Sequence, residues 1–216
     1  MINKYSPEVL NSIKSDILAL LRTIDRENAD IEGLINKLET SDFFYAPASI
    51  KYHNCFTGGL ADHSLNVYYN LKSMVKSKGL EDQISEDSII ICSILHDFSK
   101  INFYEKSIRN KKVYTDHGSK YDNLGTYDWV SEECYSVKPE SERFIYGNHE
   151  ETSEFMVRTF IPLTLAESIA ILNHHGGMGF DSIKLKSPIT NLYNKYPLAC
   201  LLHLADMMST YVDESY

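Results

Sequence analysis

Residues 89–97 read IIICSILHD, an apolar run that ends in a histidine and an aspartate. Together with its flanks, this run predicts a helix over Ser85–Asp97 whose Ile89–Leu95 part is apolar almost all round. A helix without a polar face must be covered on every side, so we expect it in the middle of a domain. Asp97 then lies next to the interior, where a charge is costly unless it is paired or bound to a metal.

On both sides of this run, most of the chain has the periodicity of apolar residues that is typical of helices. Pro7 is typical of a helix start, and a second short helix should follow Asp30. Further helices are predicted over residues 60–76, 151–160, 164–173 and 197–211. Residues 100–147 are instead rich in tyrosine and lack aliphatic periodicity, which indicates a β-hairpin with loops. The expected fold class is all-α: a helical bundle, residues 41–216, with a small hairpin insertion and an N-terminal helical extension, residues 1–40, packed on it.

Composition limits the class of protein. The chain has 216 residues, of which 43% are hydrophobic and 24% charged, so it can bury a core. Its net charge of −9 argues against non-specific coating of nucleic acid or an anionic membrane. No apolar run approaches the ~20 residues that span a bilayer, and the first residues do not resemble a signal peptide. The four cysteines form no CxxC pair, so we expect a reduced, soluble, cytoplasmic protein.

The placement of histidines carries the most functional information. Five of the eight lie at predicted helix ends or on the most apolar helices: His63, His96, His174, His175 and His203. One histidine on an apolar face is usually a core residue, but several beside Asp97 and Asp206 indicate a metal site. Imidazole and carboxylate together suit Mn²⁺, Fe²⁺, Ni²⁺ or Zn²⁺, whereas Mg²⁺ prefers more oxygen ligands. His63, His96, Asp97 and Asp206 would come from three helices of one bundle.

Three motifs in order resemble those of the HD-domain metal-dependent phosphohydrolases. They are GGLADHSL at residues 58–65, LHDFSK at 95–100 and LAD at 204–206, with a pair of histidines at 174–175 between the last two. The similarity is closest to small phage and prophage HD hydrolases and to the HD domain of bacterial 3′–5′ exoribonucleases. With these the chain shares KYH at 51–53, KINFY at 100–104 and YPL at 196–198. The resemblance covers residues 45–214, about four-fifths of the chain.

The resemblance implies an HD-domain bundle and a set of ligands. His63, His96, Asp97 and Asp206 would bind a first divalent ion. A second ion, bridged by Asp97, would take His149 and His174, and His175 would complete the histidine pair as in the HD-GYP phosphodiesterases. The implied cofactor is one or two ions of Mn, Fe, Ni, Zn or Mg.

The implied activity is metal-dependent phosphohydrolysis of a nucleotidase or phosphodiesterase type. Metal-activated water would cleave a phosphoester or phosphodiester of a nucleotide or short oligonucleotide. Asp97 would help to orient the attacking water, and Lys100, three residues further along, would contact the substrate phosphate. The expected partner is a small phosphorylated substrate such as a nucleotide, and neither duplex nucleic acid nor a membrane. Whether copies of the chain associate is left open.

Two other functions remain open from the sequence. The chain could be a nucleotide-binding regulatory module without turnover, or a 3′–5′ exonuclease on single-stranded nucleic acid. One charge feature bears on this choice: residues 100–120 carry six cations and two anions in an otherwise acidic chain. Such a basic run either attracts a polyanionic ligand or is a solvated face.

Overall fold

The computed structural model describes residues 2–144, 147–176 and 189–214. The α-helices of these ranges are α1 (Pro7–Leu21), α2 (Ile31–Thr40), α3 (Gly59–Ser77), α4 (Glu86–Leu95), α5 (His149–Arg158), α6 (Leu165–Leu172), α7 (Ile189–Lys195) and α8 (Pro197–Met208). Two 3₁₀-helices, η1 (Phe98–Lys100) and η2 (Glu140–Glu142), and a π-helix, η3 (Ser209–Asp213), adjoin them. The strands are β1 (Tyr104–Tyr114), β2 (Lys120–Asp122) and β3 (Gly125–Val137).

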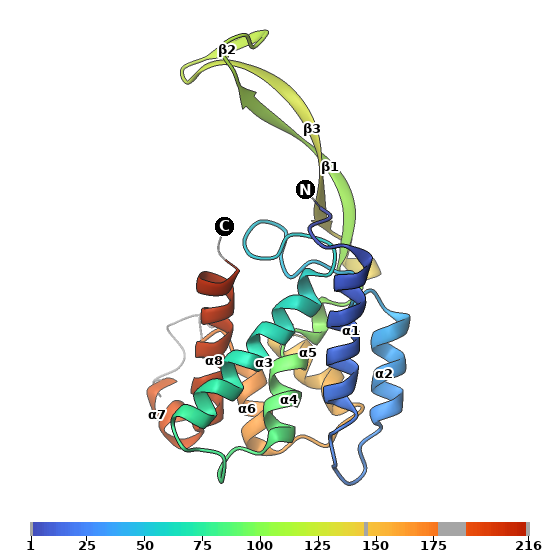
Figure 1. Cartoon of the computed structure of the whole chain (residues 1–216), viewed down its shortest axis with the longest axis vertical. Helices are drawn as coiled ribbons and strands as arrows, with labels where there is room; N and C mark the ends of the chain where they lie inside the picture. The colour runs from blue at the N-terminus through green and yellow to red at the C-terminus, as the bar shows by residue number, and fades with distance from the viewer. Residues whose placement is uncertain (1, 145–146, 177–188, 215–216) are drawn as a thin grey trace.

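The apolar helix α4 lies at the centre of the bundle, as its sequence predicts. Every residue from Ile89 to Leu95 is buried. The helices α1, α3 and α6 pack against α4, and α8 packs against α3 and α6 (Figure 1). Apolar side chains of α1 and α2 belong to the same buried cluster as those of α4 and α8. The N-terminal helices therefore cover one side of the core that holds α4.

Local capping decides where the helices begin. Ser85 accepts a hydrogen bond from the Ser88 backbone N–H at the start of α4. Reciprocal capping boxes open α5 at Asn148 and α6 at Thr164. The cap at Asn148 starts α5 at His149, two residues before the predicted start, so this histidine occupies the first turn.

The first turn of α3 is held close to the loop that precedes it. Gly59 opens the helix, and a Cβ atom there would lie 2.1 Å from the Asn54 carbonyl oxygen. Because that separation is far below a contact distance, only glycine fits. The close approach sets the position of the helix turn that carries His63.

The predicted hairpin is present, but it forms a much longer arm than expected. β1 and β3 pair antiparallel from Tyr104 opposite Val137 to Tyr114 opposite Tyr127, and β2 pairs with the other edge of β3. The arm projects away from the helices (Figure 1). The chain is thus mostly helical, and the expectation of a plain all-α fold needs correcting. The strand signal was weak because polar residues alternate with few buried ones along both strands.

Candidate metal centre

Five segments far apart in the sequence bring the predicted ligands to one point. His63 lies on α3, and His96 and Asp97 directly follow α4. His149 begins α5, the His174–His175 pair follows α6, and Asp206 lies on α8. Five of these seven side chains are buried, and His149 and His175 are about one-third exposed. The structure therefore brings together all seven residues that the sequence nominated as metal ligands.

Asp97 is the centre of this group, because each of its oxygens faces a different pair of histidines. Asp97 Oδ2 lies 3.4 Å from His96 Nε2 and 3.9 Å from His63 Nε2. Asp97 Oδ1 lies 3.7 Å from His174 Nε2 and 3.9 Å from His149 Nε2. Two ligand atoms on one ion, each at about 2.1 Å from it, are about 3.0–3.5 Å apart. The observed separations need only a small contraction to hold a cation on each side of the carboxylate.

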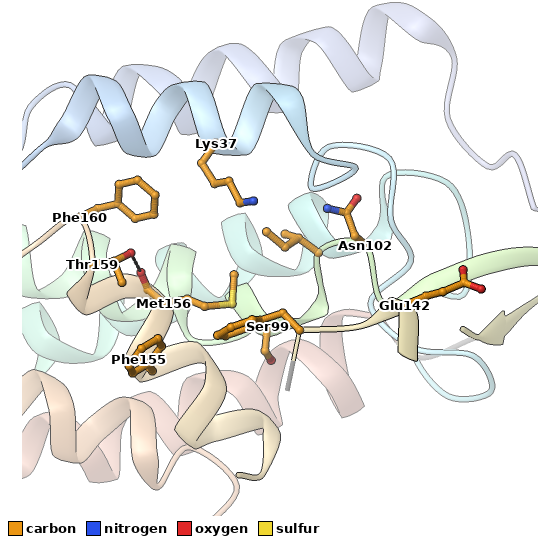
Figure 2. Close-up of a pocket in the computed structure, with 10 residues that line it drawn as sticks. Lys37, Ser99, Asn102, Glu142, Phe155, Met156, Thr159 and Phe160 are labelled. Atoms are coloured by element: carbon orange, nitrogen blue, oxygen red, sulfur yellow. Dashed lines mark hydrogen bonds between the residues drawn. The ribbon is translucent and has the colours of Figure 1, made fainter. Parts of the chain in front are cut away.

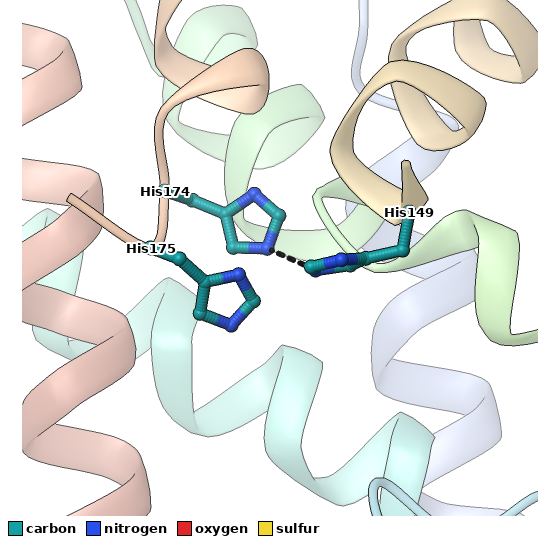
Figure 3. Close-up of side chains that lie close together, drawn as sticks. All are labelled: His149, His174 and His175. Atoms are coloured by element: carbon teal, nitrogen blue, oxygen red, sulfur yellow. Dashed lines mark hydrogen bonds between the residues drawn. The ribbon is translucent and has the colours of Figure 1, made fainter. Parts of the chain in front are cut away.

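Asp206 extends the same pattern from the opposite helix. Its Oδ1 lies 3.2 Å from His63 Nε2, and its Oδ2 lies 3.8 Å from His175 Nε2. In one set of three residues, His63, His96 and Asp97, the ligand atoms lie within 4.8 Å of one another. A second set with the same property consists of His149, His174 and His175. Figure 3 shows the second set, with all three rings gathered and the Nε2 atoms of His149 and His174 3.3 Å apart. These buried clusters of imidazole and carboxylate could hold a metal ion.

Among the residues that the structure describes, several ligand atoms are buried without a hydrogen-bond partner. They are His63 Nε2, His96 Nε2 and Asp97 Oδ1, and all three point into the centre. His63 Nε2 is close to Asp206 but is not aligned for a hydrogen bond. A buried polar atom left in this state costs about 1–3 kcal/mol. A divalent cation would satisfy all three atoms at once, so the donor set fits a metal.

The other ring nitrogen of each buried histidine is held by a specific acceptor. Nδ1 of His96 donates to the Ser93 carbonyl at 2.8 Å, and Nδ1 of His174 donates to the Ile171 carbonyl at 2.7 Å. A carbonyl only accepts, so each Nδ1 carries a hydrogen, and in the neutral form of the ring Nε2 then has the lone pair that a metal binds. Metal-binding histidines are oriented in this way in proteins.

Glu150 has a structural role that the sequence did not reveal. It is 6% exposed, and its two oxygens lie 3.0 Å from His149 Nδ1 and 3.1 Å from His175 Nδ1. One carboxylate thus orients two rings that come from different segments. The sequence alone favoured a solvated helix start for this residue, although its position next to His149 was a usable signal.

Glu214 and His53 also belong to the site. Glu214 is buried, and its Oε1 lies 3.0 Å from His63 Nδ1 and accepts a hydrogen bond from Asn66. The ring of His53 lies 4.7 Å from that of His63, and both of its nitrogens are buried with no hydrogen bond to any described residue. No motif marks Glu214, because it lies 151 residues from the histidine that it holds. Of the two, only His53 lies in a stretch that the resemblance marks, KYH at residues 51–53.

The carboxylates of the site stay ionised at neutral pH. Burial opposes ionisation of Asp97, but Lys100 and His96 hold its pKa well below the usual range. Burial likewise opposes ionisation of Asp206 and Glu150, but the histidines around each of them lower its pKa. Negative charge at three buried carboxylates is what a divalent cation needs.

The histidines of the site differ in the direction in which their pKa is shifted. Burial lowers the pKa of His174 to about 4, so its ring is neutral and its lone pair is available at neutral pH. Burial and the neighbouring His63 and Lys100 lower the pKa of His53 to about 4 as well. His63 differs, because its attraction to Asp206 and Glu214 outweighs the effect of burial and raises its pKa to about 10. His63 therefore carries a proton at neutral pH in the metal-free protein.

A cavity of about 180 Å³ opens beside these residues. Its walls are Tyr52, His53, Asp97, Lys100, His175, Asp206, Met207, Thr210 and Tyr211. Lys100 donates a hydrogen bond of 2.6 Å to Asp97 Oδ2, and only 14% of its side chain is exposed. The lysine nominated for phosphate contact thus lies in the cavity wall, and its ammonium group is ion-paired with the central aspartate.

The basic run at residues 100–120 is mostly not at the cavity. Lys100 is its only cation among the described wall residues, and the others lie along the arm. Arg109 pairs with Glu132 of β3 at 2.5 Å, and Lys112 pairs with Asp122 of β2 at 2.6 Å. Acidic residues later in the sequence, Asp122 and Glu132, therefore neutralise part of the positive charge of residues 100–120.

Comparison of the chain with models of protein families, with curated proteins and with solved structures finds no match. Over the described residues, no helix combines the length and apolar character needed to cross a membrane.

The contacts of Glu150 lead to a prediction about metal affinity. Glu150→Gln keeps the size of the side chain but removes the charge that orients His149 and His175. We expect about 10- to 100-fold weaker binding of Mn²⁺, as for other carboxylates that orient metal-binding histidines. Isothermal titration of the EDTA-treated protein measures the change. Glu151→Gln is the matched control, because Glu151 caps α5 instead. Equal affinities for the two variants would contradict the role assigned to Glu150.

The raised pKa of His63 leads to a second prediction, on pH. Mn²⁺ must displace the proton of His63, so binding should release a proton and strengthen about tenfold per pH unit for each proton released. Titrations at pH 6.5, 7.5 and 8.5, in buffers of different ionisation enthalpy, measure both quantities. Glu214→Gln removes one of the two carboxylates that raise this pKa, so fewer protons should be released at pH 8.5. Affinity that is independent of pH over this range would refute the protonated state.

Proposed function

We propose that this protein is a metal-dependent phosphohydrolase that cleaves a phosphoester or phosphodiester of a nucleotide or short oligonucleotide. The observation that carries the proposal is the position of Asp97. Its two oxygens face two groups of histidines, one of these oxygens accepts a hydrogen bond from Lys100, and both Asp97 and Lys100 line the cavity. The order of the motifs at residues 58–65, 95–100 and 204–206, similar to HD-domain phosphohydrolases, supports the same class of reaction.

The residues of the site have separable tasks. Divalent ions bound there would supply Lewis acidity for the attack of water on phosphorus and for departure of the leaving oxygen. Asp97 and Asp206 supply negative charge that holds such ions between the histidines. The Lys100 ammonium lies where it can offset charge that builds up on the phosphoryl oxygens. The neutral ring of His53 lines the cavity and can hydrogen-bond an entering oxygen, because no described residue hydrogen-bonds its nitrogens.

The dimensions of the cavity favour a substrate whose phosphate enters while its organic part stays outside. A volume of about 180 Å³ is smaller than the roughly 300–1,000 Å³ of sites that enclose a whole drug-sized ligand. Tyr52 and Tyr211 border the cavity and are 78% and 66% exposed. Such rings are stacking surfaces for a base. A nucleotide with its base at the rim fits this arrangement.

The arm gives no support to tight binding of long nucleic acid. Arg109 and Lys112 are engaged by acidic partners, so they offer less free positive charge to a phosphate backbone. This favours a mononucleotide, a cyclic nucleotide or a short oligonucleotide over a long strand. A regulatory module without turnover and a 3′–5′ exonuclease are outcomes that the experiment below distinguishes.

The direct test is hydrolysis by metal-loaded protein. EDTA-treated protein should be inactive, and Mn²⁺ should restore hydrolysis of bis(p-nitrophenyl) phosphate or p-nitrophenyl phosphate. Asp97→Ala should lose bound Mn²⁺ and activity together, whereas Asp116→Ala, on the exposed part of the arm, should lose neither. A panel of nucleotides, cyclic nucleotides and single-stranded RNA then ranks the substrates. Binding of Mn²⁺ and nucleotide without turnover of any of these compounds would favour the regulatory module instead.

Lys100 separates catalysis from metal binding, because an ammonium group has no lone pair for a metal. In Lys100→Ala, Mn²⁺ content should not fall, since Asp97 only loses a competing cation. The value of kcat/KM should fall about 30- to 1,000-fold, as for loss of one charge-stabilising donor. Lys100→Arg should recover part of the loss.

The matched control is Lys111→Ala, on the arm, where the side chain is 61% exposed. This variant should keep the wild-type kcat. A wild-type rate for Lys100→Ala with the best substrate would show that the phosphate does not bind at this lysine.

A further inference from the structure

A second and larger pocket lies between α2, η1 and α5 (Figure 2). Its volume is about 530 Å³, and none of its described lining residues lines the metal cavity. Pockets that bind small organic molecules span roughly 300–1,000 Å³. The space is therefore large enough for one aromatic molecule of one to three rings.

The wall of this pocket is mainly apolar. Ile101, Phe155, Met156 and Phe160 line it. Phe155 is 40% exposed although it lies on a helix that packs against the core. Aromatic rings and a polarisable thioether form favourable surfaces for another flat ring. An apolar ligand would cover side-chain area that the fold leaves in water.

One end of the pocket is polar and carries hydrogen-bond donors. Figure 2 shows Lys37 and Asn102 near each other at this end, with Glu142 at a distance from both. Within the described residues, Lys37 has no ion pair within 4.0 Å, and the Asn102 side chain makes no hydrogen bond. An ammonium group and a carboxamide together can bind an anionic oxygen. The charge at this end thus matches an anionic group on the ligand.

We propose that this pocket binds a small aromatic anion: its rings lie on Phe155, Met156 and Phe160, and its carboxylate, sulfonate or phosphate meets Lys37 and Asn102. The proposal is independent of metal binding and of catalysis, because it uses different residues. Glu142 lies on the far side of Asn102 from Lys37, so we expect the anionic group of the ligand to lie nearer to Lys37 (Figure 2).

The test is a fluorescence titration of the full-length, EDTA-treated protein with 8-anilinonaphthalene-1-sulfonate, an aromatic anion. Wild-type protein should bind one probe molecule at this site. Lys37→Met keeps the aliphatic stem and removes the charge, so it should weaken binding about fivefold or more. Lys76→Met is the matched control, because Lys76 lies in the last turn of α3 as Lys37 lies in the last turn of α2, but it is exposed and does not line the pocket.

Two further measurements distinguish this pocket from other apolar surfaces. Thr159→Trp places an indole in the pocket from an exposed position, so it should abolish binding while the circular dichroism spectrum stays native. The uncharged probe N-phenyl-1-naphthylamine should bind wild type and Lys37→Met equally. Unchanged sulfonate affinity in Thr159→Trp, or equal weakening by Lys37→Met and Lys76→Met, would overturn the proposal.

Discussion

The charge of Asp97, buried at the end of the most apolar helix, is the constraint on which the rest of the structure depends. Burying an ionised carboxylate in this position destabilises the folded state unless cations or hydrogen-bond donors surround it. Here Lys100 provides one counter-charge, and four histidine rings face its two oxygens. Three of these histidines lie at helix ends: His96 after α4, His149 at the start of α5 and His174 after α6. The candidate metal centre is therefore also the place where these groups offset the cost of the buried Asp97 charge.

Helix termini make this arrangement possible. His96 directly follows α4 and His174 lies two residues past the end of α6, and each uses the backbone carbonyl three residues earlier to fix its ring. His149 stands at the start of a helix, where a capping box sets its position. Carbonyls left without a helical partner thus become acceptors for the rings, and a helix end both satisfies its own backbone and orients a ligand.

The two cavities and the arm divide the molecule into regions of different chemistry. The metal cavity is small and bordered by charged groups, whereas the pocket beside α2 and α5 is larger and mostly apolar. The arm contributes to neither and balances its own charges across paired strands. Part of the basic run is neutralised within the arm, because Arg109 lies opposite Glu132 of β3 and Lys112 pairs with Asp122 of β2.

The sequence by itself determined the central helix and the mostly helical class, because periodicity is a local property. Residue type nominated His63, His96, Asp97 and Asp206 as ligands, and the resemblance to HD-domain phosphohydrolases added His149, His174 and His175. It also indicated a hairpin at residues 100–147, but not its length, since strands exposed on both faces show little hydrophobic alternation. Only the tertiary structure decided that Glu150 joins His149 to His175 and that Glu214 holds His63. These contacts form between segments that are far apart in the sequence. The pattern of residues within one helix does not determine which other helix packs against it.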